Sequence, residues 1–281
     1  MSATSGDVGL ERADGALRLA WDVRGTRTRV ASLYQRAPLR VLFPDGDVDL
    51  PAEAVLVNTA GGIVGGDRLQ VELKAEAGTC VTVTSQAAEK VYRAAHGAAR
   101  IATRVEVAAD AWFEWLPQET ILFDGARLER RLEISLEPGA RLLAAETLLF
   151  GRAARGELLR CGHLHDSWAI RLGGRLAWAD RTRLDGDLRQ ALDRPFGFGG
   201  TVGMTTILHA GPATASFLPR ARELVASVPV EGGATLVGGL LLIRLLARDG
   251  AGLRDAAAHL TMALRHEITG MRPIPPRVWR S

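Results

Sequence analysis

The sequence of 281 residues predicts a mainly β protein, with many short strands in stacked or sandwich-like sheets and two α-helices in its C-terminal half. Three observations predict this class. From about residue 15 to residue 210, apolar and polar side chains alternate, which is typical of strands with one buried and one wet face. Turn-forming pairs interrupt these runs at short intervals. In the last quarter of the chain, apolar side chains recur at helical spacing.

The alternating runs define the predicted strands. Residues 17–23, 81–84 and 131–137 each place an apolar side chain at every second position. Gly173-Gly174 separates two such runs and predicts a two-residue β-hairpin. The other turn signals are Asp45-Gly46, Glu76-Ala77-Gly78, Asp124-Gly125, Pro138-Gly139 and Asp185-Gly186.

A weak repeat accompanies the strands. Residues 77–83, 109–115 and 138–144 each combine a turn with the start of an apolar run. Their spacing of about 30 residues lies in the range of repeat architectures. The repeat therefore suggests similar layers of sheet packed in series.

The C-terminal region predicts the two helices. Residues 215–228 and 253–268 carry apolar side chains on one helical stripe each. Gly270 is placed to end the second helix, and a Pro-rich tail over residues 271–281 cannot continue it. Since no long linker interrupts the chain, residues 1–281 are expected to form a single β-rich domain.

Charge and hydropathy limit the partners. Arginines are spread along the chain among Asp and Glu, so no basic patch indicates nucleic acid. The most apolar stretch, residues 236–247, contains Arg244 and is shorter than the roughly 20 residues that span a bilayer, so no membrane partner is expected. The polar start and the absence of a disulfide framework, with only Cys80 and Cys161, predict a cytoplasmic location.

The segment Asn58–Asp67 reads NTAGGIVGGD and first suggests a phosphate loop. A Walker loop needs Gly-Lys followed by Ser or Thr, but here Gly66 is followed by Asp67 and Arg68. Residues 69–73 alternate as a strand, so the glycines are predicted to join two strands, where backbone approaches backbone or takes a positive φ. No nucleophile elbow or metalloprotease motif is present either, and an enzyme is not expected.

Five blocks together carry a family resemblance. They are residues 58–67, 84–93 (TSQAAEKVYR), 115–121 (WLPQETI), 151–157 (GRAARGE) and 272–277 (RPIPPR). In this order they resemble the UreD family of urease accessory proteins, also called UreH. Glu89 departs from the small polar residue, such as Thr, that many members carry there. The positions to which the resemblance gives a structural role are Gly61, Gly62, Gly65, Gly66, Gln118, Gly151, Arg152 and Glu157.

The resemblance implies a urease maturation factor without catalytic activity. It implies a scaffold that binds apo-urease subunits and UreF, and through UreF the GTPase UreG, which carries nickel. Nickel would pass along a polar interior channel and bind only transiently, with no tightly bound cofactor. Two alternatives are a β-rich carbohydrate or small-molecule hydrolase using Asp and Glu, and an interaction module unrelated to urease.

Four carboxylates are candidates for the nickel route. Asp67 follows the glycines and could instead tie down the turn. Glu119 could instead belong to a structural clamp with Gln118. Glu146 lies in an apolar run, where a carboxylate is costly unless it is paired or hydrated, which makes it a candidate for facing an internal wet channel. Asp180 shares strand parity with Trp178 and is a second candidate for facing that channel.

Cys161, His163 and His165 form the most metal-like local pattern. On a strand the period of two places the three side chains on one face, and nickel accepts thiolate and imidazole. The alternative is an exposed strand with two solvated histidines. The triplet lies outside the family blocks, which weakens the metal hypothesis.

Overall fold

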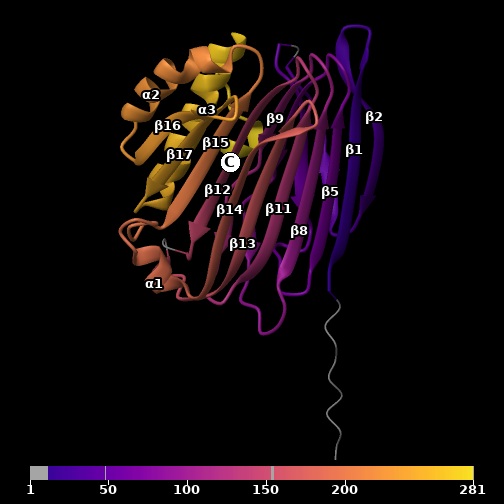
Figure 1. Cartoon of the computed structure of the whole chain (residues 1–281). Helices are drawn as coiled ribbons and strands as arrows, with labels where there is room; N and C mark the ends of the chain where they lie inside the picture. Colours follow the sequence, from indigo (N-terminus) through magenta and orange to yellow (C-terminus); the bar gives the residue numbers. More distant parts are fainter. Residues whose placement is uncertain (1–11, 48, 153–154, 281) are drawn as a thin grey trace, which may run out of the picture.

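The computed structural model describes residues 12–47, 49–152 and 155–280, which form two packed sheets (Figure 1). In these residues sheet A has seven strands, in the order β14 (Arg175–Asp187), β13 (Cys161–Leu172), β11 (Arg127–Leu136), β8 (Ala99–Val107), β5 (Arg68–Ala75), β1 (Asp14–Arg24) and β2 (Arg27–Arg36). Sheet B has the order β16 (Glu231–Val237), β17 (Leu240–Ala247), β15 (Gly203–Ala210), β12 (Arg141–Phe150), β9 (Trp112–Leu116), β6 (Cys80–Ser85), β4 (Ala52–Asn58) and β3 (Leu39–Leu42). The short strands β7 (Glu89–Val91) and β10 (Thr120–Leu122) extend sheet B beside β12. The prediction of a mainly β fold is confirmed.

The middle of both sheets is parallel, because between β4 and β13 the chain passes from one sheet to the other after most strands. In sheet A, β1, β5, β8, β11 and β13 are parallel, and in sheet B, β4, β6, β9 and β12 are parallel. The weak sequence repeat follows this winding. Cys80, Trp112 and Arg141 lie in register on β6, β9 and β12.

The turns before these three strands also match. Gly78, Asp110 and Gly139 each stand two residues before the aligned position, with φ of +70°, +59° and +84°. Glycine adopts this left-handed conformation without penalty, and Asp is among the few other residues that tolerate it. The repeat therefore encodes one turn geometry used in three successive layers.

The two sheets differ in how many faces they bury. The strands of sheet A alternate, so that β5 is exposed and buried in turn along its length. All of β9 and most of β12 are buried on both faces. This difference arises because sheet B lies between sheet A and the helices, which makes its strands nearly continuous apolar runs.

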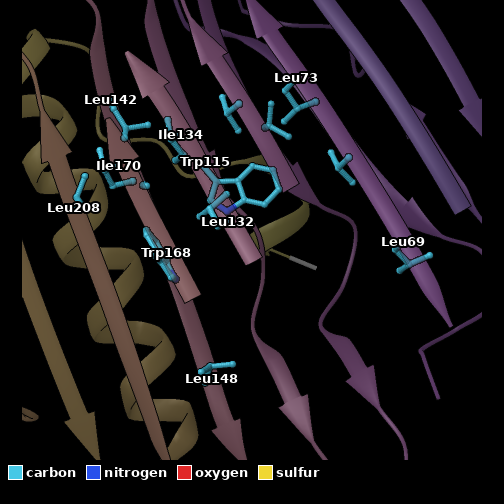
Figure 2. Packing of buried hydrophobic residues seen from close by; sticks show 14 of the residues in the cluster. Leu69, Leu73, Trp115, Leu132, Ile134, Leu142, Leu148, Trp168, Ile170 and Leu208 are labelled. Carbon is cyan, nitrogen blue, oxygen red and sulfur yellow. The ribbon is translucent and has the colours of Figure 1, made fainter. Parts of the chain in front are cut away.

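Two apolar layers result. The larger lies between the sheets and includes Trp115, Trp168 and Ile170 (Figure 2). The second lies between the outer face of sheet B and the helices and includes Trp112, Leu143 and Leu260. Both layers consist mainly of aliphatic side chains and tryptophans, so a charged group inside them is exceptional.

The helices match the prediction with adjusted ends. Residues 215–228 form a 3-10 turn, η2 (Thr214–Phe217), followed by α2 (Leu218–Ala226). The second helix is α3 (Gly250–Thr269), which begins three residues before the predicted start because the Asp249 side chain accepts from the backbone N–H groups of Ala251 and Gly252. It ends at Gly270, with φ of +72°.

One helix was not predicted, and the tail is ordered by side-chain contacts. Helix α1 (Leu188–Asp193) has only six residues, too few for a helical stripe to be visible in the sequence. The proline-rich tail packs on sheet B and forms a 3-10 turn, η3 (Arg277–Arg280). Trp279 Nε1 donates to Thr84 Oγ1 at 3.0 Å, which fixes the tail on β6.

Candidate functional site

A cluster of charged side chains lies between the two sheets, where the surrounding layer is apolar. Arg130 of β11 places Nε 2.7 Å from Asp166 Oδ1 and Nη2 2.9 Å from Glu146 Oε2. Arg130 Nη1 donates to Thr120 Oγ1 at 3.1 Å, and Trp115 Nε1 donates to Glu146 Oε1 at 2.8 Å. No side chain of Arg130, Glu146 or Asp166 is more than 9% exposed. These three residues are called the interior cluster below.

Strand parity places each member of the cluster. Glu146 has the same parity on β12 as Leu142, Ala144 and Leu148, which belong to the layer between the sheets. Arg130 and Asp166 are register partners on the parallel strands β11 and β13. The fold therefore brings two carboxylates from opposite sheets to one guanidinium.

Burial and the attraction between opposite charges act against each other in the cluster. Burial raises the pKa of Glu146, Arg130 lowers it and Asp166 raises it, and the net direction is upward. Burial alone would lower the pKa of Arg130, but Asp166 and Glu146 raise it, so the guanidinium stays charged. When both carboxylates are ionised, the cluster carries one negative charge in excess. Such a site attracts a cation more strongly than the same groups would in water.

A polar row leads from the cluster to the edge of the sandwich. Glu146 pairs in register with Thr206 of β15, and Thr206 pairs with Arg244 of β17. Arg244 Nη2 then reaches Asp180 Oδ2 of β14 at 2.6 Å. The Asp180 and Arg244 side chains are 34% and 31% exposed, so this pair lies where the space between the sheets meets solvent.

Asp67 and Glu119 lie elsewhere, in structural contacts. Asp67 is 6% exposed and accepts from the backbone N–H groups of Ala13, at 2.9 Å, and Val64, at 2.8 Å. Its two oxygens tie down the turn, one of the two roles expected for it. Glu119 forms an ion pair of 3.0 Å with Arg254 of α3 and so joins sheet B to the helix.

The glycines of residues 58–67 connect β4 to β5, as predicted. A Cβ on Gly62 would lie 2.5 Å from Tyr92 Cε2, and one on Gly65 would lie 2.6 Å from His96 O. Gly61 and Gly66 have φ of +73° and +96°. Gly151, in a different block, has φ of +92°, and a Cβ there would lie 2.5 Å from the carbonyl oxygen of Glu157. These positions need glycine for backbone geometry.

Gln118, Arg152 and Glu157 also make local contacts. Gln118 Nε2 donates to the carbonyl oxygens of Gln86, at 2.8 Å, and Val278, at 3.3 Å. Arg152 and Glu157 form a bidentate pair with distances of 2.7 and 3.0 Å. Arg152 also lies over the ring of Phe123, 4.3 Å from its centroid.

Three of the five sequence blocks, residues 58–67, 84–93 and 115–121, contact one another directly. Asn58 Nδ2 donates to Glu89, Tyr92 Oη donates to the carbonyl oxygen of Gly61 at 3.0 Å, and the backbone N–H of Gly151 donates to Leu122 O at 2.8 Å. Gln118 links this group to the C-terminal tail. Segments that are distant in sequence are therefore joined by direct hydrogen bonds.

The metal-like triplet lies on the outer face of sheet A. Cys161 is exposed, and His163 Nδ1 lies 2.9 Å from Asp185 Oδ1 of the neighbouring strand. In the described part of the chain no group of three or more His, Cys, Asp or Glu side chains is arranged to hold a metal ion. The structure thus places the three residues on one face, but beside Asp185 and Arg183 and not around a common point.

Among the described residues, four charged side chains at buried positions were not identified from the sequence. Arg130 and Asp166 have the same strand parity as the apolar residues of β11 and β13. This parity indicates a buried position and could have identified both residues. Glu114 and Arg265 form a second buried pair at 3.4 Å, on the outer face of sheet B under α3. Arg265 lies on a helical face, and its pairing with a residue 151 positions away leaves no local signal.

The chain is similar throughout its length to known proteins. The model of the family described as UreD urease accessory protein matches residues 13–280. A protein named urease accessory protein UreD from Rhizobium leguminosarum bv. viciae is 41% identical over 269 residues, 96% of each chain. Proteins of the same name from Magnetococcus marinus and Azorhizobium caulinodans are 42% and 44% identical, over 94% and 96% of this chain and 93% and 97% of theirs. None of the described helices is long and apolar enough to cross a membrane.

Proposed function

The chain belongs to the family of UreD urease accessory proteins, and from this premise we propose that it matures urease as a non-enzymatic scaffold. The scaffold binds apo-urease and UreF, and through UreF it joins the GTPase UreG. In this assembly it assists the insertion of nickel into the urease active site. The division of labour leaves nucleotide chemistry to UreG, which agrees with the sequence at residues 66–68, where Asp67 and Arg68 replace the lysine and hydroxyl of a phosphate loop.

The observation that supports a nickel route is the interior cluster. Two carboxylates, Glu146 and Asp166, share Arg130 inside an otherwise apolar layer. A buried charge network of this kind contributes little to stability, because desolvation offsets the attraction between the charges. Attraction of a cation would explain why the chain keeps this charge network in an apolar layer.

The ligand types in the interior cluster favour transient passage of nickel over tight binding of nickel. Nickel is held most firmly by imidazole and thiolate, whereas carboxylate oxygens are weaker ligands for it. Arg130 also competes with any cation for the same oxygens. The polar row from Glu146 through Thr206 to the Asp180–Arg244 pair gives this proposed route its opening at the edge of the sandwich.

The scaffold role is tested by co-purification and activation together. Tagged protein expressed with the urease subunits, UreF and UreG should retain them, and a strain lacking this chain should recover urease activity when the gene is restored. Retention of partners without any effect on urease activation would indicate an unrelated interaction module. Failure to retain them, together with turnover of a glycoside panel, would favour a hydrolase.

A further inference from the structure

Glu89 is a half-buried carboxylate that forms no ion pair with any residue in the described part of the chain. It lies on β7, and its two oxygens are 3.1 and 3.2 Å from Asn58 Nδ2. The backbone N–H of Lys90 also donates to the carboxylate. Glu146, by contrast, has the guanidinium of Arg130 as a charged partner. When Glu89 is ionised, neutral donors alone hold its oxygens, so its negative charge is available to a cation.

One side chain connects Glu89 to the interior cluster. Strand β7 pairs in parallel with β10, and Glu89 is the register partner of Thr120. Neighbouring strands lie about 4.8 Å apart, and residues in register project to the same face of the sheet. Thr120 Oγ1 accepts from Arg130 Nη1 at 3.1 Å. Since Arg130 binds both carboxylates of the interior cluster, Thr120 stands between Glu89 and that cluster.

The position of Glu89 joins the interior of the sandwich to its surface. Glu89 has the same parity on β7 as Val91, which belongs to the apolar layer between the sheets. At its other end the carboxylate meets Asn58, which is half-buried and is followed by the exposed residues 59–61. Glu89 therefore lies between solvent at this turn and the layer that contains the interior cluster.

Glu89 and the Asp180–Arg244 pair lie in opposite directions from Glu146. Strand β12, which carries Glu146, has β15 on one side and β10 on the other. The polar row over β15 and β17 ends at the Asp180–Arg244 pair. The row over β10 and β7 ends at Glu89. A route through the protein needs two ends, and these two rows provide them.

We propose that Glu89 captures nickel at the second end of the route, where its carboxylate attracts the divalent cation from solvent toward the interior cluster. This inference rests on the proposed function. Carboxylate oxygens are weak ligands for nickel, which suits capture followed by release. A purely structural role would need only the acceptor oxygens of Glu89, because Asn58 and Lys90 donate to a neutral oxygen as well as to a charged one.

The rate of nickel transfer to purified apo-urease, in the presence of UreF, UreG, GTP and bicarbonate, tests the proposal. Glu89→Gln keeps an acceptor but removes the charge, so nickel incorporation at pH 8 should be about fivefold slower. Glu89→Asp restores the charge and should keep at least about half of the original rate. Burial raises the pKa of Glu89 to about 7, with Asp67 adding to the shift and Lys90 opposing it. At pH 6 the original carboxyl is therefore mostly protonated, and the original protein and Glu89→Gln should transfer nickel equally fast.

The matched control is Glu106→Gln, which removes the same charge at an exposed position of β8. It should leave the rate within about twofold of the original, since solvent and salt screen a distant exposed charge. Urea unfolding and retention of UreF establish that each variant is folded and assembles. An unchanged rate of Glu89→Gln at pH 8, an equal loss in Glu106→Gln, or a loss that is the same at both pH values would each overturn the proposal.

Glu146→Gln in the same assay separates this inference from the route itself. A normal rate with Glu146→Gln would remove the route and the role of Glu89 together. Slow transfer with Glu146→Gln but normal transfer with Glu89→Gln would keep the route and overturn only the capture of nickel by Glu89. Slow transfer with both variants, confined for Glu89→Gln to pH 8, is the result that we expect.

Discussion

Arg130 of β11 and Glu146 of β12 meet across the two sheets, with Nη2 and Oε2 2.9 Å apart, inside the main apolar layer. Asp166 approaches the same guanidinium from the neighbouring strand, at 2.7 Å. Glu146 and Asp166 therefore both depend on Arg130 to compensate their negative charge. This dependence makes the arginine the most sensitive position of the interior cluster.

Arg130→Met should destabilise the fold by about 3–5 kcal/mol, because it leaves two buried carboxylates without a partner. The free energy of unfolding in urea measures this loss. Arg131→Met is the matched control, since Arg131 points to solvent from the same strand and should change stability by no more than about 0.5 kcal/mol. Equal stabilities of the two variants would show that water reaches the carboxylates of the interior cluster and compensates their charge.

Glu89 should make stability depend on pH. Burial raises its pKa to about 7, with Asp67 adding to the shift and Asn58 opposing it. The folded state thus binds the Glu89 proton more tightly than the unfolded chain, whose value is 4.5. The contribution of Glu89 to the free energy of unfolding is therefore fully present below pH 4.5. It falls by up to about 3 kcal/mol as the pH rises to about 7.

Glu89→Gln tests that dependence, because it removes the titrating group and keeps an oxygen facing Asn58. Urea unfolding is compared at pH 5 and pH 7.5 for both proteins. The original protein should lose more stability over this interval than the variant does. The same pH dependence in both proteins would assign the effect to other groups.

Gly62→Ala should destabilise the protein by about 2–4 kcal/mol, since the new Cβ would lie 2.5 Å from the Tyr92 ring and 2.8 Å from Lys90 O. Gly61→Ala provides the comparison, because that site also has a positive φ but has no atom within 4 Å of the added Cβ. The cost at Gly61 should be about 1 kcal/mol, from backbone conformation alone. Thermal unfolding of both variants measures the difference, and equal losses would refute the close-packing explanation.

His163→Ala/His165→Ala should leave the nickel affinity of the protein unchanged in equilibrium dialysis. His163 is held by Asp185, and no cluster that could bind a metal is formed in the described residues. A double variant at His96 and His259 controls for the number of histidines. An affinity about tenfold lower only in the first variant would make the triplet a real nickel site.

The sequence was sufficient for the fold class because period two and helical spacing are local signals. Residues 173–174 form the expected hairpin turn between β13 and β14, and α3 covers the expected residues 253–268. The distribution of strands between two sheets could not be read locally. It depends on register between parallel strands, such as Trp112 with Arg141, which only the three-dimensional winding fixes.

The candidate site was predictable only in part, because contacts between the two sheets cannot be read from local sequence patterns. The apolar run around Glu146 predicted a carboxylate facing a wet channel, because an unpaired buried charge is costly, and the structure instead pairs the buried Glu146 with Arg130. Its partner Arg130 comes from the other sheet, and the ion pair depends on how the sheets pack. For Asp67 the sequence left two roles open, and the structure shows its oxygens bound to the backbone of Ala13 and Val64.

The central claim, that the interior cluster guides nickel, is tested most directly with Glu146→Gln in a strain lacking this chain. The substitution removes the charge and keeps an acceptor for Trp115 Nε1. Glu106→Gln, at an exposed position of β8, is the control. Nickel content and activity of the purified urease are measured, with retention of UreF and urease subunits as the check on assembly. We predict normal assembly with nickel content and activity about tenfold lower for Glu146→Gln alone; full nickel content and activity with that variant would contradict the account.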